Sequence, residues 1–388
     1  MLWLELVVFA YFSYVVAYSL LFSIAGLFYK VPSFLSVKKN DHFNKIAVII
    51  PAYKEDAVII EVARQALSQS HPKSQYDVIV IADSLKQATI DELKKLNIIV
   101  HEVHFERSTK VKSLQSVLNT YEGYEIAVIL DADNIMQGDF LEKINICYAN
   151  GWRVIQGRRT AKNRNTSFAV LDGLSESIAN HINRQGAIAL GLSSPLIGSG
   201  MAFNFVLLKE IMNTIDSVVE DKELQIKILD RGEQIHYLKN AVVLDEKIDN
   251  PEVFKNQRTR WMSGHYAHLR SDFSKGIKSL FKGNLSIFNI TILFSIQLPR
   301  MMNLGLLGII TLVCTLFHSF LPLPFWYWIV LFGSYLLSFA LAIPSSYYNR
   351  SLINAVLQAP KAFFIIMLLH FKLKGADKKF IHTPHKQQ

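Results

Sequence analysis

The chain has 388 residues, 51% of them hydrophobic, which is enough for two or three domains and a large core. It contains only two cysteines, Cys147 and Cys314, so their number excludes a disulfide framework or a cysteine zinc site and suits a reducing compartment. A net charge of +9 would suggest nucleic acid for a soluble protein. Here the basic residues lie beside long apolar stretches, which indicates contact with anionic lipid and no nucleic acid partner.

Two stretches are long and apolar enough to cross a membrane. Residues 6–29 form a 24-residue span without a charged side chain, and residues 301–349 form a 49-residue one, whereas a membrane helix needs about 20. A signal peptide is the alternative for the first stretch, but the start MLWLE is acidic and no convincing cleavage site follows. We expect a membrane protein with a soluble insert, in which prolines divide the second stretch into crossings at 301–320 and 325–344.

The basic residues beside these stretches set the expected orientation. They are Lys30, Lys38, Lys39, Arg350, Lys361, Lys372, Lys374, Lys378, Lys379 and Lys386. Under the positive-inside rule they mark the cytoplasmic side, which predicts a multi-pass protein of the cell (inner or plasma) membrane with a cytoplasmic insert. The last apolar run, 355–371, either crosses the membrane or lies in its interface. We favour the interface, because a crossing would put the basic tail outside.

The insert alternates apolar strands with helices. Strands are predicted at 46–50, 77–82, 98–100 and 126–130, which with the helical patterns between them is typical of a parallel, doubly wound sheet. Downstream we expect helices at 140–148, 167–189 and 219–229, strands at 152–157 and 242–244, and a glycine-rich loop at 191–200. The basic and aromatic patterns of 252–269 and 280–298 predict helices in the membrane interface.

Two acidic residues follow the most apolar of these strands. Asp131 and Asp133 stand two apart at its carboxyl end, and Asp83 ends a neighbouring strand at the same edge, where open α/β sheets bind ligands. An Asp-x-Asp pair there can hold Mg²⁺ or Mn²⁺ with few protein oxygens and leave other positions to phosphate and water. The alternative is an aspartate-rich turn that caps the next helix.

A series of short motifs spans about 210 residues of the chain. They are PAYKED at 51–56, Asp83, KVKSL at 110–114, DAD at 131–133, GSG at 198–200, ED at 220–221 and QRTRW at 257–261. The series resembles the membrane-embedded family-2 glycosyltransferases, which include cellulose, hyaluronan and poly-N-acetylglucosamine synthases and ceramide glucosyltransferases. The resemblance implies an α/β fold of the GT-A type, with a Rossmann-like mixed sheet inserted between transmembrane helices and amphipathic interface helices.

The resemblance also divides the chain into four parts. Residues 1–40 would be an N-terminal transmembrane anchor and 41–250 a cytoplasmic GT-A domain. Residues 251–300 would form interface helices that carry QxxRW, and 301–388 a transmembrane hairpin, an interfacial helix and a basic cytoplasmic tail. The sequence FIHTPH at 380–385 resembles a cytoplasmic segment of related bacterial enzymes.

On the donor side, the resemblance gives Asp133 the metal, Mg²⁺ or Mn²⁺, which would neutralise the leaving diphosphate, and Asp131 the ribose or donor sugar. The other implied donor-binding residues are Ala52, Tyr53, Glu55, Asp83, Lys110, Gln257 and Arg260. Among them, Asp83 would contact uracil, Lys110 would lie near the diphosphate and Arg260 would clamp the phosphates. An Arg-Trp pair at a membrane interface can also simply anchor to lipid headgroups.

On the acceptor side, the resemblance makes Asp221 the base that takes the proton of the attacking hydroxyl. Glu220 would bind the acceptor beside it, although both acids also favour a helix amino end electrostatically. Trp261 would offer a flat apolar surface to the acceptor sugar. Gly198 and Gly200 would let backbone approach the saccharide, unless they only form a turn.

Three segments depart from the family pattern. Residues 84–87 read Ser-Leu-Lys-Gln where relatives often have Asn-Ser-x-Asp, and Val111-Lys112 replaces a small glycine-containing pair. Asn204 stands where relatives frequently carry a basic residue. None of these departures touches the metal, base or QxxRW positions.

The resulting hypothesis is an inverting transfer of a sugar from a UDP-sugar, UDP-glucose or UDP-N-acetylglucosamine, to a saccharide or lipid-linked acceptor at the membrane. The product would be a β-glycoside, made in polysaccharide or glycolipid synthesis by a single chain or an oligomer. One alternative is a catalytically silent, nucleotide-binding membrane scaffold. Another is a metal-dependent nucleotidyl or phospho-alcohol transferase, which would want a glycine-rich phosphate loop that PAYKED does not offer.

Overall fold

The computed structural model describes residues 2–35, 42–216, 220–248 and 251–370, without the side chains of residues 251–253, 256, 260 and 351. The predicted roles of Lys38, Lys39 and the 380–385 segment lie outside the described residues. The chain forms two compact units. A sheet unit comprises Lys30–Asn163 and Ser193–Lys247, and a helical unit comprises the residues up to Tyr29, Arg164–Leu192 and the chain from Ile248. The four-part domain division stays a prediction.

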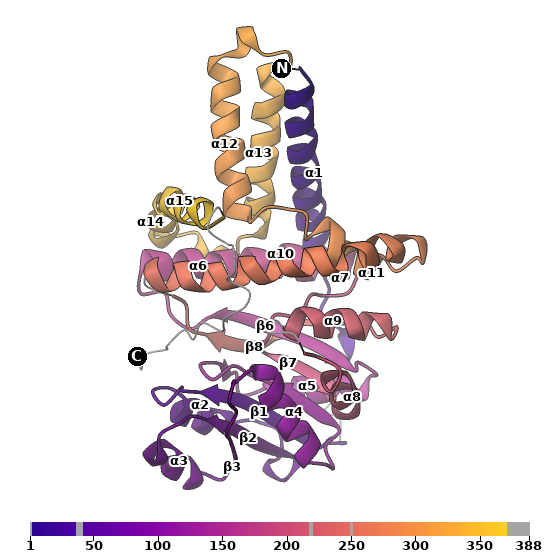
Figure 1. The fold of residues 1–388 in the computed structure, drawn as a ribbon, viewed down its shortest axis with the longest axis vertical. Coiled ribbons are helices and arrows are strands. Elements are labelled where there is room, and N and C mark those ends of the chain that lie inside the picture. The colour runs from indigo at the N-terminus through magenta and orange to yellow at the C-terminus, as the bar shows by residue number, and fades with distance from the viewer. Residues whose placement is uncertain (1, 36–41, 217–219, 249–250, 371–388) are drawn as a thin grey trace. The chain divides into compact units, whose positions relative to one another are not determined.

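The sheet unit is built on one mixed sheet with the strand order β3-β2-β1-β4-β7-β6-β8-β5 (Figure 1). The strands are β1 (Ile46–Tyr53), β2 (Tyr76–Asp83), β3 (Ile99–Val103), β4 (Ile126–Ile129), β5 (Ile135–Met136), β6 (Val154–Ala161), β7 (Met201–Asn204) and β8 (His236–Asp245). The strands β3, β2, β1 and β4 are parallel, as the alternating pattern predicts. The apolar residues of β1, β2 and β4 do not alternate with polar ones because both faces of the sheet are buried there, whereas β3, at the edge, is only partly buried.

Helices of the sheet unit pack around this sheet. They are α2 (Ile59–Ala66), α3 (Gln87–Lys94), α4 (Lys110–Thr120), α5 (Phe140–Ala149), α8 (Phe205–Met212) and α9 (Glu220–Asp230). One apolar core joins the strands to α2 and α5, with Ile50, Val128 and Phe140 fully buried in it. Burial of such side chains stabilises the fold by about 1.5–3 kcal/mol each.

The second half of the sheet differs from the prediction. There β7 runs antiparallel to both β4 and β6, which makes the sheet mixed, as the resemblance implies. β7 and α8 were not expected: β7 has only four residues, and α8 follows it directly. The side chain of Asn204 caps α8 by accepting a hydrogen bond from the Leu207 N–H at 2.9 Å, which accounts for an asparagine at this position. β6 and β8 are longer than expected, because the polar residues at their ends do not belong to the apolar pattern from which the strands were predicted.

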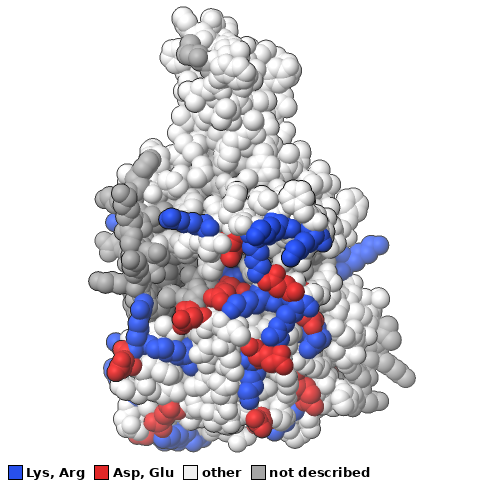
Figure 2. Space-filling view, turned by 45° about the vertical axis from the view of Figure 1, so that its right-hand side comes forward, with Lys and Arg blue, Asp and Glu red and all other residues white. Residues whose placement is uncertain are grey.

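The helical unit contains the long apolar helices. Its elements are α1 (Leu2–Leu27), α6 (Ser167–Ala179), α7 (Ala187–Ala189), α10 (Pro251–Phe281), α11 (Leu285–Phe288), α12 (Arg300–Leu316), α13 (Phe325–Ala342), α14 (Arg350–Leu357), α15 (Ala359–His370) and the π-helical η3 (Asn180–Gly186) and η4 (Asn289–Leu293). α1, α12 and α13 run side by side around a core that includes Phe12, Leu307 and Trp328 (Figure 1). Figure 2 shows that this three-helix part carries almost no charged side chain on the face in view.

Among the described residues, three helical stretches are long and apolar enough to cross a membrane: Leu2–Leu27, Phe325–Ala342 and Leu352–His370. α12 is apolar but shorter. The third stretch is broken by a turn at Gln358 into α14 and α15, which lie across α12 (Figure 1). Phe363 of α15 packs where a Gly305 side chain would be, 2.2 Å from the ideal Cβ position. This crosswise packing favours the predicted interfacial position of 355–371, which stays a prediction.

The segment after residue 250 differs from the expected two interface helices. A single helix, α10, runs for 31 residues, and the second predicted helix is divided among its end, α11 and η4. The helix continues past residue 269 because its polar residues are compatible with a helix, and His268 and Asp272 lie one turn apart, 3.4 Å from each other.

Candidate active site

The carboxyl ends of the parallel strands lie together at the point where the strand order reverses. β1 pairs with β2 on one side and with β4 on the other, so the chain's direction of travel across the sheet changes there. Tyr53 and Asp83 are partners in register at the ends of β1 and β2, and Asp131 follows β4. Open α/β sheets bind ligands outside such a reversal, which makes this edge the candidate site.

Asp83 is buried at this edge with one oxygen engaged and one free. Its side chain is 1% exposed, and Oδ1 accepts a hydrogen bond from the Ser84 hydroxyl at 3.0 Å. Within the described residues, Oδ2 has no hydrogen-bond partner. Lys54 and Ser84, at the ends of the same two strands, have positive φ angles of 56° and 58°. Such backbone is sparsely populated by residues other than glycine and is concentrated at functional sites.

Lys110 joins three segments of the sheet unit. It begins α4, which the Thr109 side chain caps by accepting a hydrogen bond from the Lys112 N–H. Its Nζ donates hydrogen bonds to Asp131 Oδ1 at 2.5 Å and to the Gly198 carbonyl at 2.7 Å, and it lies 3.5 Å from Glu220 Oε1. Burial alone would lower the pKa of Lys110, but the charges of Asp131 and Glu220 outweigh it and raise that pKa.

The two acids of the ED motif lie in the first turn of α9, beside the glycine loop. Burial raises the pKa of Glu220, and the neighbouring charge of Asp221 adds to the rise, while Lys110 opposes it. An added Cβ at Gly198 would lie 3.9 Å from Asp221 Oδ2 and 3.8 Å from Lys110 Nζ, so this backbone lies close to both charged groups. Gly198 has φ +83° and Gly200 has φ +63°, which only glycine adopts without strain.

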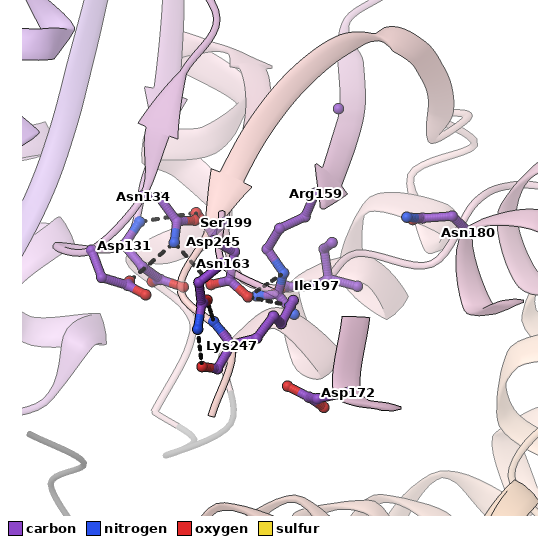
Figure 3. Close-up of polar contacts among 12 residues, drawn as sticks. Asp131, Asn134, Arg159, Asn163, Asp172, Asn180, Ile197, Ser199, Asp245 and Lys247 are labelled. Carbon is purple, nitrogen blue, oxygen red and sulfur yellow. Dashed lines mark hydrogen bonds and ion pairs between the residues drawn. The ribbon is translucent and has the colours of Figure 1, made fainter. Parts of the chain in front are cut away.

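A hydrogen-bonded network extends this cluster across the sheet (Figure 3). The Ser199 hydroxyl accepts a hydrogen bond from the Asp131 N–H at 2.9 Å and donates one to Asn134 Oδ1. Asn134 Nδ2 donates to Asp133 Oδ1 and to Asp245 Oδ1, at 3.0 Å each. One amide group therefore holds two carboxylates next to each other.

Two basic residues close the far side of this network (Figure 3). Lys247, whose side chain is 4% exposed, donates to Asp245 Oδ2, and Arg159 Nε lies 3.7 Å from the same oxygen. Asn163 fixes the Lys247 backbone in both directions: its Nδ2 donates to the Lys247 carbonyl at 3.0 Å, and its Oδ1 accepts from the Lys247 N–H at 2.6 Å. Asp245 thus sits between one amide and two cations.

The QRTRW residues lie on α10, in the helical unit. Arg258 pairs with Asp172 and lies over the Trp261 ring, 4.6 Å from its centroid. Trp261 is 41% exposed. Gln257 Oε1 is buried, and within the described residues it has no hydrogen-bond partner. The Arg260 side chain is not among those described, so the predicted roles of this motif stay predictions.

The structure brings together five of the predicted residues of the sheet unit, and it adds residues that the sequence reasoning missed. Lys110, Asp131, Gly198, Glu220 and Asp221 form one group. The missed residues are Asn134, Arg159, Asn163, Ser199, Asp245 and Lys247. Adjacency to motifs could have indicated Asn134 and Ser199, and Asp245 directly follows an apolar strand segment as Asp83 does.

Comparison with known proteins places the chain in a family. A family model described as glycosyltransferase like family 2 matches residues 44–264. The chain belongs to this family. The match covers the strands of the sheet unit, the DAD, GSG and ED motifs and the QRTRW motif. The resemblance inferred from the motifs is therefore confirmed.

Curated relatives are distant and longer. A probable glycosyltransferase of Bacillus subtilis, YdaM, is 23% identical over 243 residues, covering 57% of this chain and 55% of that protein. The beta-monoglucosyldiacylglycerol synthase of Trichormus variabilis is 24% identical over 231 residues, covering 57% of this chain and 49% of that protein. The chain spans about half the length of these relatives.

A solved structure is similar in fold. The mannosyltransferase PcManGT from Pyrobaculum calidifontis, in complex with GDP-Man and Mn²⁺, is 18% identical, with a TM-score of 0.51 over 90% of this chain and 98% of that one. This likeness concerns the fold alone, and it confirms the predicted mixed α/β architecture of the GT-A type.

Proposed function

We propose that the protein is an inverting, metal-dependent glycosyltransferase of the membrane. It would transfer a sugar from a UDP-sugar, UDP-glucose or UDP-N-acetylglucosamine, to a saccharide or lipid-linked acceptor and form a β-glycosidic bond. The observation that carries this proposal is the grouping of Lys110, Asp131, Glu220 and Asp221 around Gly198 at the reversal point of the sheet. Carboxylates and a fixed cation at such an edge are what a sugar nucleotide and an acceptor hydroxyl require.

The nucleotide would bind along the ends of β1 and β2. The unpartnered Asp83 Oδ2 is a hydrogen-bond acceptor held at 1% side-chain exposure, so it favours a base that presents an N–H group. Ala52, Tyr53 and Glu55 would line the same edge, and Lys110, with Gln257 and Arg260 from α10, would bind the diphosphate and sugar. Both uracil and guanine present an N–H group, so a nucleotide series decides between them.

The residues around Asn134 fit a hard divalent ion. Among the described residues, no three His, Cys, Asp or Glu side chains form a metal-binding group, but Asp133 presents a carboxylate beside that of Asp245. Carboxylate oxygens suit Mg²⁺ and Mn²⁺, which keep positions for phosphate and water. Asp133 would hold the ion, which when bound would neutralise charge on the leaving diphosphate.

Asp221 would take the proton of the acceptor hydroxyl. Its carboxylate lies beside the Gly198 backbone, where an added Cβ would be 3.9 Å from Asp221 Oδ2, and a saccharide would approach this backbone. Glu220, whose pKa burial raises, would bind the acceptor beside it. Trp261, which is 41% exposed and packs over Arg258, would provide a flat apolar surface for the acceptor sugar.

Membrane helices and glycolipid-synthase relatives favour a lipid-linked acceptor. Three apolar stretches can cross a membrane, and the relatives named above include a synthase of a glucosyl lipid. We propose that α1, α12 and α13 span a cell membrane, that the sheet unit is cytoplasmic, and that α10, α14 and α15 lie in the interface, with the four-part domain division predicted above. Assembly into an oligomer is compatible with this arrangement.

The test supplies purified protein in lipid nanodiscs with radiolabelled UDP-glucose, UDP-N-acetylglucosamine and GDP-mannose, each with Mg²⁺ or Mn²⁺. We expect one UDP-sugar to be consumed, with label in a lipid-extractable or polymeric product. Asp221→Asn should lower kcat by about 10²–10⁴-fold while leaving donor binding intact, since a general base contributes about that much. Full turnover by Asp221→Asn would refute the base assignment, and nucleotide binding without consumption would favour the silent scaffold.

A further inference from the structure

The carboxylate of Asp245 faces the DAD motif although it lies at the far end of the sheet unit's sequence. Asp245 ends β8, and its Oδ1 lies 3.0 Å from the same Asn134 nitrogen that bonds Asp133 Oδ1. Two carboxylate oxygens thus converge on one nitrogen, whose N–H groups carry partial positive charge. The Asn134 amide, with Asp245 beside it, is drawn in Figure 3, and carboxylate oxygens that lie around one electropositive point are the ligands that a hard cation prefers.

The other oxygen of Asp245 is occupied by basic side chains. Lys247, at 4% side-chain exposure, and Arg159, at 13%, both approach Oδ2. Burying a lysine ammonium costs several kcal/mol unless a carboxylate compensates it, and Asp245 is the carboxylate that compensates Lys247. It neutralises Asp245 while leaving Oδ1 bonded to the Asn134 amide, which also bonds Asp133.

We infer that Asp245 is a second carboxylate ligand of the divalent ion that Asp133 would hold, and that Lys247 is the internal cation that balances Asp245 in the metal-free protein. This inference rests on the proposed metal-dependent function. The metal would be shared by the DAD loop and the end of β8, two segments more than 100 residues apart in the sequence. Asn134, held by Ser199, keeps the two carboxylates adjacent before the ion arrives.

The charges of Asp245 and Lys247 should change the affinity for a divalent cation in opposite directions. Lys247 and a divalent cation would both be attracted to the Asp245 carboxylate and would repel each other, so the ammonium should weaken metal binding. Removing the Asp245 charge should weaken Mn²⁺ binding, because a ligand is lost. Removing the Lys247 charge should strengthen it, because a nearby repulsive charge is lost. A purely structural ion pair predicts neither change, since both variants would then affect stability alone.

The test measures Mn²⁺ binding directly, by the electron paramagnetic resonance signal of free Mn²⁺, in purified full-length protein. Titrations are run with Mn²⁺ alone, with UDP and with GDP, so that an unsuitable nucleotide does not hide the site. We expect Asp245→Asn to weaken Mn²⁺ binding at least 10-fold, Asp133→Asn to weaken it similarly or more, and Lys247→Met to tighten it about 3-fold or more. Asp139→Asn is the matched control, because Asp139 is half exposed and pairs with Lys143.

The outcomes separate this inference from the proposed function. If wild-type protein binds no Mn²⁺ under any of the three conditions, the metal-dependent function itself fails. If Asp133→Asn weakens binding but Asp245→Asn matches wild type, only the Asp245 inference is overturned. Size-exclusion and thermal-unfolding profiles monitor folding. Lys247→Met serves as the second variant, because tighter binding cannot result from misfolding, and unchanged or weaker binding in folded protein would overturn the role of Lys247.

Discussion

Replacing Lys110 by methionine removes one ammonium group and keeps the length of the side chain. In the structure that ammonium donates to Asp131 at 2.5 Å and to the Gly198 carbonyl at 2.7 Å, and lies 3.5 Å from Glu220. The variant would leave two carboxylates near each other without their shared cation, so the pKa of Glu220, already raised by burial, should rise further. We expect the variant to fold less stably and to bind the donor less well.

The magnitude follows from how buried the partners are. Breaking a fully buried ion pair costs about 3–5 kcal/mol, and a charged hydrogen bond about 1.5–3 kcal/mol. The side chains of Lys110, Asp131 and Glu220 are 21%, 34% and 12% exposed, so water screens part of the interaction. We therefore expect a loss of about 2 kcal/mol in the free energy of unfolding and a fall of about 10–100-fold in kcat/KM for the donor.

The sign of the pH dependence gives a second check. Because the pKa of Lys110 is raised in the folded protein, its stabilisation is fully present below the unfolded-state value of 10.5 and is lost only as pH rises through the folded-state value. The Lys110 charge itself should therefore add no pH dependence to the difference between wild type and Lys110→Met in chemical denaturation between pH 6 and 9, and any growth of that difference with pH would report the further rise in the pKa of Glu220. Lys112→Met is the control, since Lys112 is exposed and donates only to the Arg107 carbonyl. Equal stability and donor KM in Lys110→Met and wild type would refute the reasoning.

Two further predictions concern stability. Gly186→Ala should lower the thermal unfolding midpoint, with a cost of about 1–3 kcal/mol, because the added Cβ would lie 2.2 Å from the Phe22 carbonyl oxygen; Gly333→Ala has open space at the Cβ and should unfold at or above the wild-type temperature. Burial lowers the pKa of His236, whose ring stacks on that of Trp152 with centroids 4.1 Å apart, to about 4. The stability that neutral His236 contributes is fully present above about pH 6.5 and is lost as pH falls. The free energy of unfolding of wild type, measured by chemical denaturation, should therefore be about 2 kcal/mol lower at pH 5 than at pH 7.5, and His236→Phe should remove this difference. Equal losses in both proteins would contradict this.

The sequence predicted the fold best where periodicity and length were strong. The apolar strands β1, β2 and β4 and the long apolar helices α1, α12 and α13 stand where the pattern of the sequence predicts them. β7 was missed because its four residues adjoin the glycine loop and lead directly into α8. The extent of β8 was underestimated because strand pairing with β6, a long-range interaction, extends it beyond its apolar residues.

For the site, the sequence predicted the residues that carry motifs and missed those that connect them. Asp131, Lys110 and Glu220 are brought together as expected of one site. Asn134 and Asp245 were not predicted as site residues, because they are brought together by a contact between the end of β8 and the loop after β4. No local spacing in the sequence indicates that contact. The β-bulge after Gly157, on the strand beside β8, shows why register in this region is not readable from alternation.

The bond between Asn163 and Lys247 has a mechanical consequence. Asn163 is the last residue of the sheet unit before the chain departs at Arg164, and Lys247 is the last before it departs at Ile248. The two points at which the chain leaves the sheet unit are thus joined by two hydrogen bonds between the Asn163 side chain and the Lys247 backbone. The Lys247 side chain also pairs with Asp245. Because Asn163 is bonded to the Lys247 backbone and the Lys247 side chain is bonded to Asp245, a change of charge at Asp245 acts on both points at which the chain leaves the sheet unit.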